Sequence, residues 1–510
     1  MADVHFKING MEATAPDGST ILEAAQANGV EIPTLCYLKD QNKIAACRMC
    51  LVEVKGARIP QAACITPVRE GMEIETESEL AKDSRRRNLE LIAENHHLDC
   101  EYCPNYQDCE LHALFVRYRV DTRKYGDFAR KPQYDETSPH LGRDASRCIL
   151  CRRCVSACAK QCVNAVAVLG RGINSEVGAP EGLGNSACIG CGQCAAVCPT
   201  GSIFVKDDTH SVWVTINQGK KPVIAVVAPA VSVALGEKLH EQTGTNVSGK
   251  LTAFLHKVGV KKVYAIAQTD TAAEKRKQIK EMASEGRTAL SSDCPAFVRY
   301  VENFCPEFKE NLICAPSPEM VCAKKAREAY AKESGVNPKD IMVVSISSCT
   351  AQKLECLRPE YEGVIDAAIT TGELYDMLHH ACLSRYTTLD VWRKLKPEPF
   401  DPLTEVKEWE NAVEDDDKVQ IIPDVIPGDL SGTVREFTFE LNGTTLKGKA
   451  VSGIANAQKL LRDLKDGHAD FDYLAVRACP GGCVAGGGQP KLTGKERNFE
   501  HPIEKRAAAL

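Results

Sequence analysis

Apolar and polar positions alternate near the start of the chain in a pattern that predicts a β-hairpin. In VHFKINGMEATA, residues 4–15, the alternation is interrupted by Asn9-Gly10, a pair typical of two-residue hairpin turns. The following STILEAAQANG reads as a helix that ends at Gly29, because glycine readily adopts the left-handed conformation found after helix ends. The chain therefore begins with a predicted strand–turn–strand–helix unit.

Three later segments extend this pattern. PVIAVVAPAVSVAL, residues 222–235, reads as a buried strand and turn, because it contains proline and is shorter than the roughly 20 residues of a membrane helix. REFTFELNGTTLKGKAVSG, residues 435–453, predicts a second hairpin that turns at Asn442-Gly443. The acidic, proline-rich residues 394–429 are expected to form a solvated surface excursion.

Length and composition indicate a soluble protein of several domains. The chain has 510 residues, 44% of them hydrophobic and 26% charged, and single hydrophobic cores stop growing at roughly 250–300 residues. A formal net charge of -6 argues against nucleic-acid binding. The start, MADVHFKING, shows no secretory signal, so we expect a cytoplasmic, reducing setting. There, 25 clustered cysteines, an odd number, indicate metal or redox chemistry rather than disulfides.

The first cysteines follow the predicted hairpin and helix with the spacing C-x10-C-x2-C-x13-C. Four thiolates on a loop-rich segment suit a 2Fe–2S cluster, and residues 1–80 resemble a β-grasp 2Fe–2S ferredoxin domain. The alternative is a zinc site, since C-x2-C pairs also bind zinc. The expected ligands are Cys36, Cys47, Cys50 and Cys64.

The next group combines one histidine with three cysteines. AKDSRRRNLELIAENH, residues 81–96, reads as a helix that presents His96 at its end, ahead of an H-x3-C-x2-C-x5-C pattern. Such a set would hold a 4Fe–4S cluster within residues 81–125, and histidine ligation generally raises a cluster's potential. His97 competes for the histidine position, and a zinc site with the same ligand types is the alternative. The expected ligands are His96, Cys100, Cys103 and Cys109.

Residues 138–208 contain two C-x2-C-x2-C-x3-C runs, CILCRRCVSAC and CIGCGQCAAVC. This is the pattern of bacterial two-cluster ferredoxins, in which the fourth cysteine of each run binds the other cluster. One predicted 4Fe–4S site therefore comprises Cys148, Cys151, Cys154 and Cys198, and the other comprises Cys188, Cys191, Cys194 and Cys158. Cys162 is surplus and is expected to pack rather than bind iron.

The order of these groups resembles the large iron–sulfur subunit of complex I and the accessory region of iron-only hydrogenases. Residues 209–510 favour the second family, since four segments resemble its catalytic domain. The segments are APAVSVALGEKL (228–239), SSDCPAFVRYVENFCPE (291–307), SISSCTAQKLE (345–355) and ACPGGCVAGGGQP (478–490). The resemblance implies a multidomain α+β and α/β protein: a β-grasp domain, a histidine-ligated 4Fe–4S domain, a two-cluster ferredoxin domain and an iron-only-hydrogenase-like α/β domain with its cysteines at strand ends.

In that family a 4Fe–4S cubane is joined through one cysteine to a diiron unit with carbonyl and cyanide ligands. The resemblance implies four cubane ligands, which are Cys294, Cys349, Cys479 and Cys483. Cys483 stands in the bridging position. It would be an ordinary cubane ligand if no diiron unit is bound.

Several positions depart from the family pattern around the diiron unit. Asp293 replaces a proton-passing cysteine, although a carboxylate can also relay protons. Ser347-Ser348 replaces the usual methionine and proline. Gln352 stands where the family has a lysine that binds a cyanide ligand. Lys353 follows one residue later and is expected to point away from that ligand position.

Two further replacements concern the pocket wall and the proton route. Arg477 stands where a methionine packs beside the diiron unit, and an uncompensated buried charge costs on the order of several kcal/mol. Ile313 replaces a serine of the family's proton route. The four cysteines predict that the cubane site is kept, the diiron site is predicted to be lost, and Asp293 could pair with Arg477.

These features favour an electron-transfer subunit with one 2Fe–2S and four 4Fe–4S clusters and no catalytic residues of its own. The resemblance implies an electron-bifurcating hetero-oligomer with a flavin-containing, NADH-oxidising subunit, a small thioredoxin-like 2Fe–2S subunit, ferredoxin, and a separate redox enzyme such as formate dehydrogenase or another hydrogenase. Two alternatives remain. One is an active or sensory hydrogenase with an atypical pocket; the other is a structural C-terminal domain with iron only in the N-terminal half.

Overall fold

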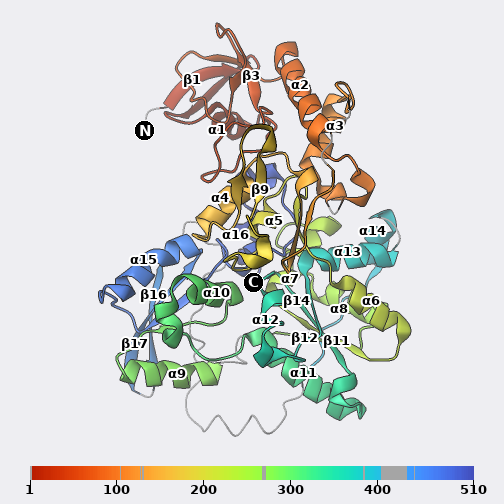
Figure 1. Ribbon diagram of the computed structural model, residues 1–510, viewed down its shortest axis with the longest axis vertical. Coiled ribbons are helices and arrows are strands. Elements are labelled where there is room, and N and C mark those ends of the chain that lie inside the picture. The colour runs from red at the N-terminus through yellow and green to blue at the C-terminus, as the bar shows by residue number, and fades with distance from the viewer. Residues whose placement is uncertain are drawn as a thin grey trace.

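The computed structural model describes residues 3–103, 105–126, 128, 131–266, 272–382, 385–403, 433–441 and 443–510. The N-terminal regions lie at one end of the long axis, and the C-terminal region, built on two sheets, lies at the other (Figure 1). The architecture is multidomain, with α+β regions followed by an α/β region, as the sequence predicts.

The first region is a small mixed sheet with one helix. Its strands are β1 (Asp3–Ile8), β2 (Met11–Pro16), β3 (Leu51–Val54), β4 (Gln61–Ala62) and β5 (Glu73–Glu75), in the order β2-β1-β5-β3-β4, and its helix is α1 (Ile21–Ala27). The predicted turn is confirmed: Ile8 pairs with Met11, and Asn9 and Gly10 have φ of 51° and 78°. Gly29, with φ of 74°, follows the helix end as expected.

A helical pair connects this sheet to the cysteine-rich centre of the chain. It consists of α2 (Glu79–Asn95) and α3 (Glu110–Tyr118). The Ser78 side chain caps α2 by accepting a hydrogen bond from the Ala81 N–H, and His96 is the residue at its C-terminal cap. The helix predicted over residues 81–96 is therefore confirmed, and it delivers His96 to the start of the cysteine-bearing loop.

The third region joins short strands and short helices. A sheet of order β10-β7-β6 contains β6 (Tyr134–Asp135), β7 (Leu141–Asp144) and β10 (Ile203–Val205), and β8 (Ala167–Leu169) pairs with β9 (Glu176–Gly178) in a separate hairpin. Its helices are α4 (Arg153–Lys160) and α5 (Gln193–Ala196). Each helix follows a cysteine loop whose turn residues have positive φ, Arg152 at 59° before α4 and Gly192 at 68° before α5. The two halves thus share one local design.

The C-terminal region contains two sheets side by side (Figure 1). The first is parallel, in the order β12-β11-β14-β15, with β11 (Val223–Val227), β12 (Lys262–Ala265), β14 (Met342–Ser347) and β15 (Ala367–Thr370). Every residue of β11 and β14 is buried, as expected for parallel strands covered on both faces. This confirms the buried strand predicted within residues 222–235. The second sheet, in the order β13-β18-β17-β16, contains β13 (Ala289–Leu290), β16 (Arg435–Leu441), β17 (Thr444–Ser452) and β18 (Tyr473–Arg477).

Helices surround both sheets. They are α6 (Thr209–Gln218), α7 (Pro229–Ser232), α8 (Ser248–Val258), α9 (Ala272–Ser284), α10 (Pro295–Phe304), α11 (Pro318–Ser334), α12 (Gln352–Glu355), α13 (Thr371–Cys382), α14 (Arg385–Lys394), α15 (Ile454–Lys465) and α16 (Pro502–Ala508). None of the helices in the described ranges has the length and apolar character needed to cross a membrane.

The second predicted hairpin is present as β16 and β17, with Leu441 paired to Thr444. Asn442 of its turn lies outside the described residues. The same holds for residues 404–429 of the predicted surface excursion, so that prediction remains open there.

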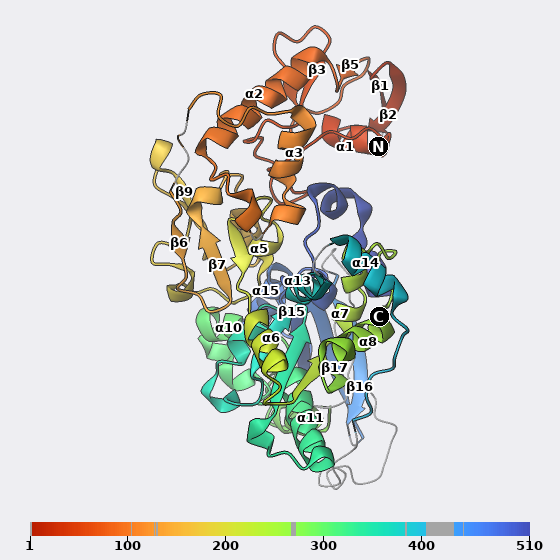
Figure 2. The same cartoon turned by 90° about the vertical axis from the view of Figure 1, so that its right-hand side faces the viewer.

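A C-terminal strap, residues 489–501, returns to the N-terminal end of the molecule (Figure 2). Arg497 Nη2 donates a hydrogen bond of 2.9 Å to the Ala196 carbonyl in α5. Asn498 Oδ1 accepts one of 2.9 Å from the Lys39 N–H in the first region. The strap therefore ties the first and third regions to the C-terminal region. The hydrophobic pattern of the chain does not predict this strap.

Candidate iron–sulfur centres and an adjoining cavity

The structure brings together the four cysteines of the first region. A hydrogen bond with the Cys47 thiol lowers the pKa of Cys36 to about 6. Hydrogen bonding to Cys64 and burial raise the pKa of Cys50, and the charge of Cys36 adds to this, which links the two pairs. All four side chains are buried. Thiols held this close in a dry loop are suited to share an iron–sulfur cluster.

His96 rather than His97 faces the protein interior. His96 is 6% exposed, and its buried Nδ1 has no hydrogen-bond partner within the part of the chain that the structure describes. Burial, aided by the charge of Arg147, lowers the pKa of His96 to about 4, so the imidazole stays neutral, the form that binds metals. His97 is partly exposed, with Nε2 4.0 Å from Asp99 Oδ2. The geometry supports the prediction that His96 is the ligand.

Three thiols lie near the end of this helix. Burial raises the pKa of Cys109 to about 11, and the charges of Cys103 and Cys100 contribute to that rise. The three cysteines therefore share one neighbourhood, as predicted from their spacing.

The two cysteine runs of the third region exchange their last members. One cavity is lined by four of these residues, which are Cys148, Cys151, Cys154 and Cys198. Burial raises the pKa of the Cys194 thiol, and the nearby charges of Cys188 and Cys158 raise it further. Cys198 of the second run thus lies with the first group, and Cys158 of the first run lies with the second.

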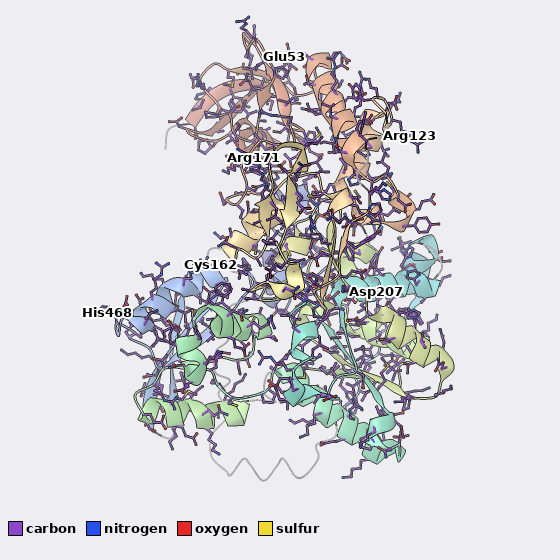
Figure 3. All side chains as sticks on the ribbon, in the orientation of Figure 1. Glu53, Arg123, Cys162, Arg171, Asp207 and His468 are labelled. Atoms are coloured by element: carbon purple, nitrogen blue, oxygen red, sulfur yellow. The ribbon has the colours of Figure 1, made fainter. Side chains whose placement is uncertain are left out.

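Cys162 lies outside these groups. It packs against the hydrophobic cluster formed by residues of α10 and α15, and Figure 3 labels it at the boundary between α4 and α15. This placement agrees with the predicted packing role. Across the described residues, no three His, Cys, Asp or Glu side chains converge as the ligands of one metal ion do. Cluster ligands bind different iron atoms and need not converge on one point.

The cysteines of the last predicted cluster group lie at or just beyond the carboxyl ends of strands in both C-terminal sheets. Cys294 caps α10, Cys349 follows β14, and Cys479 follows β18. Burial raises the pKa of Cys349 well above its usual range, and the charges of Cys294, Cys479 and Cys483 add to it. All four predicted residues therefore meet at one place.

This group lies directly against the third region. Thr350 Oγ1 donates a hydrogen bond of 2.5 Å to the Gly190 carbonyl. A Cβ atom on Gly487 would lie 2.3 Å from the Cys191 carbonyl oxygen, so only glycine permits this approach. Burial and the charge of Cys191 raise the pKa of Cys479. Two predicted cluster sites are thus in close contact through the backbone.

A cavity of about 120 Å³ adjoins the last cysteine group. Cys349 and Cys483 form one side of it, and Arg477, Glu319 and Ser348 contribute its polar groups. Cys483 is exposed, unlike the other three cysteines of its group, of which two are fully buried and one is partly buried. The cavity therefore meets the cysteine group at the position that bridges to the diiron unit in the related family.

Asp293 and Arg477 do pair beside this cavity. Arg477 Nη1 donates a hydrogen bond of 3.1 Å to the Asp293 carbonyl, and Arg477 Nη2 lies 4.0 Å from Asp293 Oδ2. Asp293 also forms a buried ion pair with Lys275, a residue that the sequence reasoning missed. Burial by itself would raise the pKa of Asp293, but the charges of Arg477 and Lys275 outweigh it and hold the pKa below its usual range.

Gln352 and Lys353 behave as their positions predict. Lys353 Nζ lies 2.8 Å from Glu373 Oε1 and 2.6 Å from Asp208 Oδ2, so it points to the start of α6 and not into the cavity. Gln352 is buried beside Glu355 and Cys356. Ile313 is buried in an apolar cluster of the second sheet. No hydroxyl stands at that point of the expected proton route.

Two buried carboxyl groups near the cavity escaped the sequence reasoning. Burial, with the charge of Glu319, raises the pKa of Glu355 to about 8. Burial also raises the pKa of Glu319. Ser317 Oγ donates a hydrogen bond of 2.9 Å to Glu355. Their positions in APSPEM and AQKLE carry no metal-binding or catalytic motif, so the sequence offers no signal for them.

Comparison with known families agrees with the order of these sites. Residues 1–79 match a 2Fe-2S iron-sulfur cluster binding domain, and residues 85–124 match the NADH-ubiquinone oxidoreductase-G iron-sulfur binding region. Residues 147–202 match a 4Fe-4S dicluster domain. Residues 221–487 match the iron only hydrogenase large subunit, C-terminal domain. The chain therefore carries iron–sulfur domains of the 2Fe–2S and 4Fe–4S types.

Curated relatives extend over nearly the whole chain. The NADP-reducing hydrogenase subunit HndD of Solidesulfovibrio fructosivorans is 33% identical over 96% of this chain and 89% of its own length. Iron hydrogenase 1 of Clostridium pasteurianum is 30% identical over 99% of this chain and 92% of its own. The NADPH-Fe(3+) oxidoreductase subunit alpha of Geobacter sulfurreducens is 37% identical over 40% of this chain and 24% of its own length. With matches of this extent, the chain belongs to the iron-only hydrogenase large-subunit family.

Proposed function

We propose that this chain is a cytoplasmic electron-transfer subunit of an NAD(P)-linked hydrogenase-type complex, with five iron–sulfur clusters and no diiron centre. The five cysteine-containing groups support the clusters, since the cysteines of each predicted set lie close together. Relatives named as an NADP-reducing hydrogenase subunit and an NADPH-Fe(3+) oxidoreductase subunit support the link to NAD(P).

The proposed loss of hydrogen chemistry rests on one observation, which is that Arg477 lines the cavity beside Cys349 and Cys483. In the related enzymes a lysine holds a cyanide ligand, and here Gln352 stands in its place while Lys353 is bound to Glu373. A neutral amide cannot replace an ammonium group against an anion. The four cysteines therefore suit a cubane, whereas the adjoining residues do not suit the diiron unit.

The proposed electron path follows the order of the groups. Electrons enter or leave at the 2Fe–2S and histidine-ligated sites, cross the two-cluster region, and reach the C-terminal cubane through the contact between Cys191 and Gly487. The proposed partners are a flavin-containing, NADH-oxidising subunit, a small thioredoxin-like 2Fe–2S subunit, ferredoxin and a separate redox enzyme. In such a complex the chain would distribute electrons in flavin-based bifurcation.

A second candidate is a hydrogenase with an atypical pocket. The cavity of about 120 Å³ beside Cys483 favours it, because space next to the bridging position is retained. Glu319, whose pKa is raised by burial, would then stand at its wall.

Infrared spectroscopy separates the two candidates. The purified chain is reconstituted anaerobically, offered a synthetic diiron precursor, and assayed for dihydrogen, with an active iron-only hydrogenase treated in parallel. We expect no protein-bound carbonyl or cyanide bands and about eighteen irons per chain. Such bands together with turnover would overturn the electron-transfer proposal, and about fourteen irons would mean that the C-terminal cubane is missing.

A further inference from the structure

A buried ion pair joins two of the predicted cluster groups. Arg153 in α4 is 1% exposed, and its guanidinium donates two hydrogen bonds to Glu110 in α3, from Nη1 to Oε1 at 2.7 Å and from Nη2 to Oε2 at 3.2 Å. Along the chain, Arg153 is the neighbour of Cys154 in the first 4Fe–4S group of the third region. Glu110 is the neighbour of Cys109 in the histidine-containing group.

The same guanidinium lies close to the cysteines of the first region. The hydrogen bond with Cys47 lowers the pKa of Cys36, and the charge of Arg153 adds to this effect. Cys36, Cys47 and Cys151 belong to one hydrophobic cluster. The carbonyl oxygens of Cys36 and Cys151 both accept hydrogen bonds from Asn42 Nδ2, at 2.7 and 2.9 Å. Arg153 therefore lies where the predicted 2Fe–2S site meets the first 4Fe–4S site.

One nitrogen of Arg153 is not used by the ion pair. Glu110 holds Nη1 and Nη2, whereas the buried Nε has no hydrogen-bond partner among the residues that the structure describes. Buried donors are almost always paired in folded proteins. The sulfur atoms of iron–sulfur clusters accept hydrogen bonds, and such bonds, together with net charge and solvent exposure, set a cluster's reduction potential. The Nε–H of a buried cation is thus suited to act on a neighbouring cluster.

The C-terminal strap covers this ion pair. A Cβ atom on Gly494 would lie 3.0 Å from Arg153 Nη2 and 3.0 Å from Glu110 Oε2, so the strap backbone passes directly over both side chains. Because solvent is kept away, the charges act more strongly on their surroundings than exposed charges would. A buried ion pair is often no more stabilising than apolar residues of similar volume. Stability alone therefore does not account for this cation.

We propose that Arg153 sets the reduction potentials of the 2Fe–2S cluster and of the first-run cluster, and thereby the ease with which an electron lost by one reduces the other. The first-run cluster is the 4Fe–4S cluster expected on Cys148, Cys151, Cys154 and Cys198. The inference rests on the proposed function, because it requires both clusters to be present. A reduced cluster carries one more negative charge than the oxidised form, so a buried cation nearby stabilises the reduced form. Arg153 should raise both potentials, and the carboxylate of Glu110 should reduce that effect.

Redox titration of the full chain with reconstituted clusters, followed by electron paramagnetic resonance, tests this inference. Arg153→Gln removes the cation, and we expect both potentials to fall by at least about 59 mV, a tenfold change in each one-electron equilibrium constant. Glu110→Gln removes the opposing carboxylate, so both potentials should rise. Loss of local structure would not produce opposite shifts from the two members of one ion pair. Arg153→Lys keeps the charge and should retain most of the parent potentials, although it loses the planar fork.

Arg171, an exposed arginine before β9 that Figure 3 labels, provides the matched control. Arg171→Gln makes the same change in net charge, but it should leave both potentials in place because solvent screens an exposed charge. Iron content is measured in every chain. Unchanged potentials in Arg153→Gln, or shifts of the same sign in Arg153→Gln and Glu110→Gln, overturn this inference alone.

Iron content also separates the remaining outcomes. If Arg153→Gln loses a cluster, Glu110→Gln decides, and the absence of a rise in its potentials overturns the inference. A parent chain that lacks the 2Fe–2S signal or the first-run signal would instead overturn the proposed function on which the inference rests.

Discussion

Arg477 donates a hydrogen bond of 3.1 Å to the backbone carbonyl of Asp293, although 184 positions separate the two residues. The contact joins the end of β18 to the turn after β13, strands that are paired in parallel. The resemblance of their motifs to the iron-only hydrogenase family predicts that both residues stand at positions that serve the diiron unit there. Their changes are therefore linked in space, and each reduces the cost of burying the other.

The first prediction concerns this linked set. Asp293→Asn removes the carboxylate that faces Lys275 and Arg477, and it leaves two cations close together in a buried site. We expect a loss of about 3 kcal/mol in the free energy of unfolding of this region, as for other broken buried ion pairs. Chemical denaturation measures it. Asp470→Asn, which removes an exposed partner of Lys449, is the matched control and should change little.

The sign of the pH dependence follows from the lowered pKa of Asp293. The stability that ionised Asp293 contributes is fully present above the pKa of an unfolded aspartate, roughly 4. It is lost as pH falls through the lower pKa that Asp293 has in the folded protein. In Asp293→Asn this acid-side loss should be smaller. An unchanged acid profile would show that the charges of Lys275 and Arg477 do not act through Asp293.

The second prediction concerns Glu355, whose pKa is raised to about 8. The folded protein holds a proton there that the unfolded chain releases, so stability should fall as pH rises from about 4.5 to 8. The slope should not exceed about 1.4 kcal/mol per pH unit. Glu355→Gln should flatten the profile in this range, whereas Glu360→Gln, a change at a nearby position, should not.

Much of the arrangement could be predicted from local signals. Asn9-Gly10 predicted a turn, and the alternation around it predicted a hairpin. Cysteine spacing predicted each group of cysteines, including the exchange of Cys158 and Cys198 between the two runs. Lys275 and the C-terminal strap could not be found in this way. Their partners are distant in sequence, and a lysine on a helix or an arginine near a chain end is usually solvated. Only the fold shows that Lys275 meets Asp293.

The third prediction tests that exchange of cysteines. Cys198→Ser should disturb the cluster of the first run, and Cys158→Ser should disturb the cluster of the second run, because each residue lies with the other run's thiols. Electron paramagnetic resonance of the reduced protein and iron analysis report which signal is lost. Cys162→Ser should leave iron content and spectra unchanged. If Cys198→Ser altered the signal of its own run, the assignment would be reversed.

The fourth prediction concerns the histidine site. His96→Cys should keep the cluster and lower its reduction potential, since a thiolate ligand disfavours the reduced state relative to a neutral imidazole. Redox titration followed by electron paramagnetic resonance measures the shift. His97→Cys is the neighbouring control and should leave the potential in place, because His97 is partly exposed and lies near Asp99. A shift of the reduction potential in His97→Cys alone would identify His97, not His96, as the ligand.

The last prediction is that no single restored residue returns hydrogen chemistry to the chain. Gln352→Lys supplies a cation at the position where the family resemblance predicts one, but Arg477 still lines the cavity and Ile313 still stands at the position predicted for the proton route. Arg477→Met clears the wall, yet it leaves the cyanide position without a cation, because Lys353 is held by Glu373 at 2.8 Å and by Asp208 at 2.6 Å. Each single variant should therefore show neither diiron infrared bands nor dihydrogen turnover after exposure to the synthetic precursor. The combination Gln352→Lys with Arg477→Met should come nearest to retaining the diiron unit, and weak bands without turnover are expected from it, since Asp293 would remain paired with Lys275. Turnover by either single variant would show that one residue alone separates this chain from an active hydrogenase.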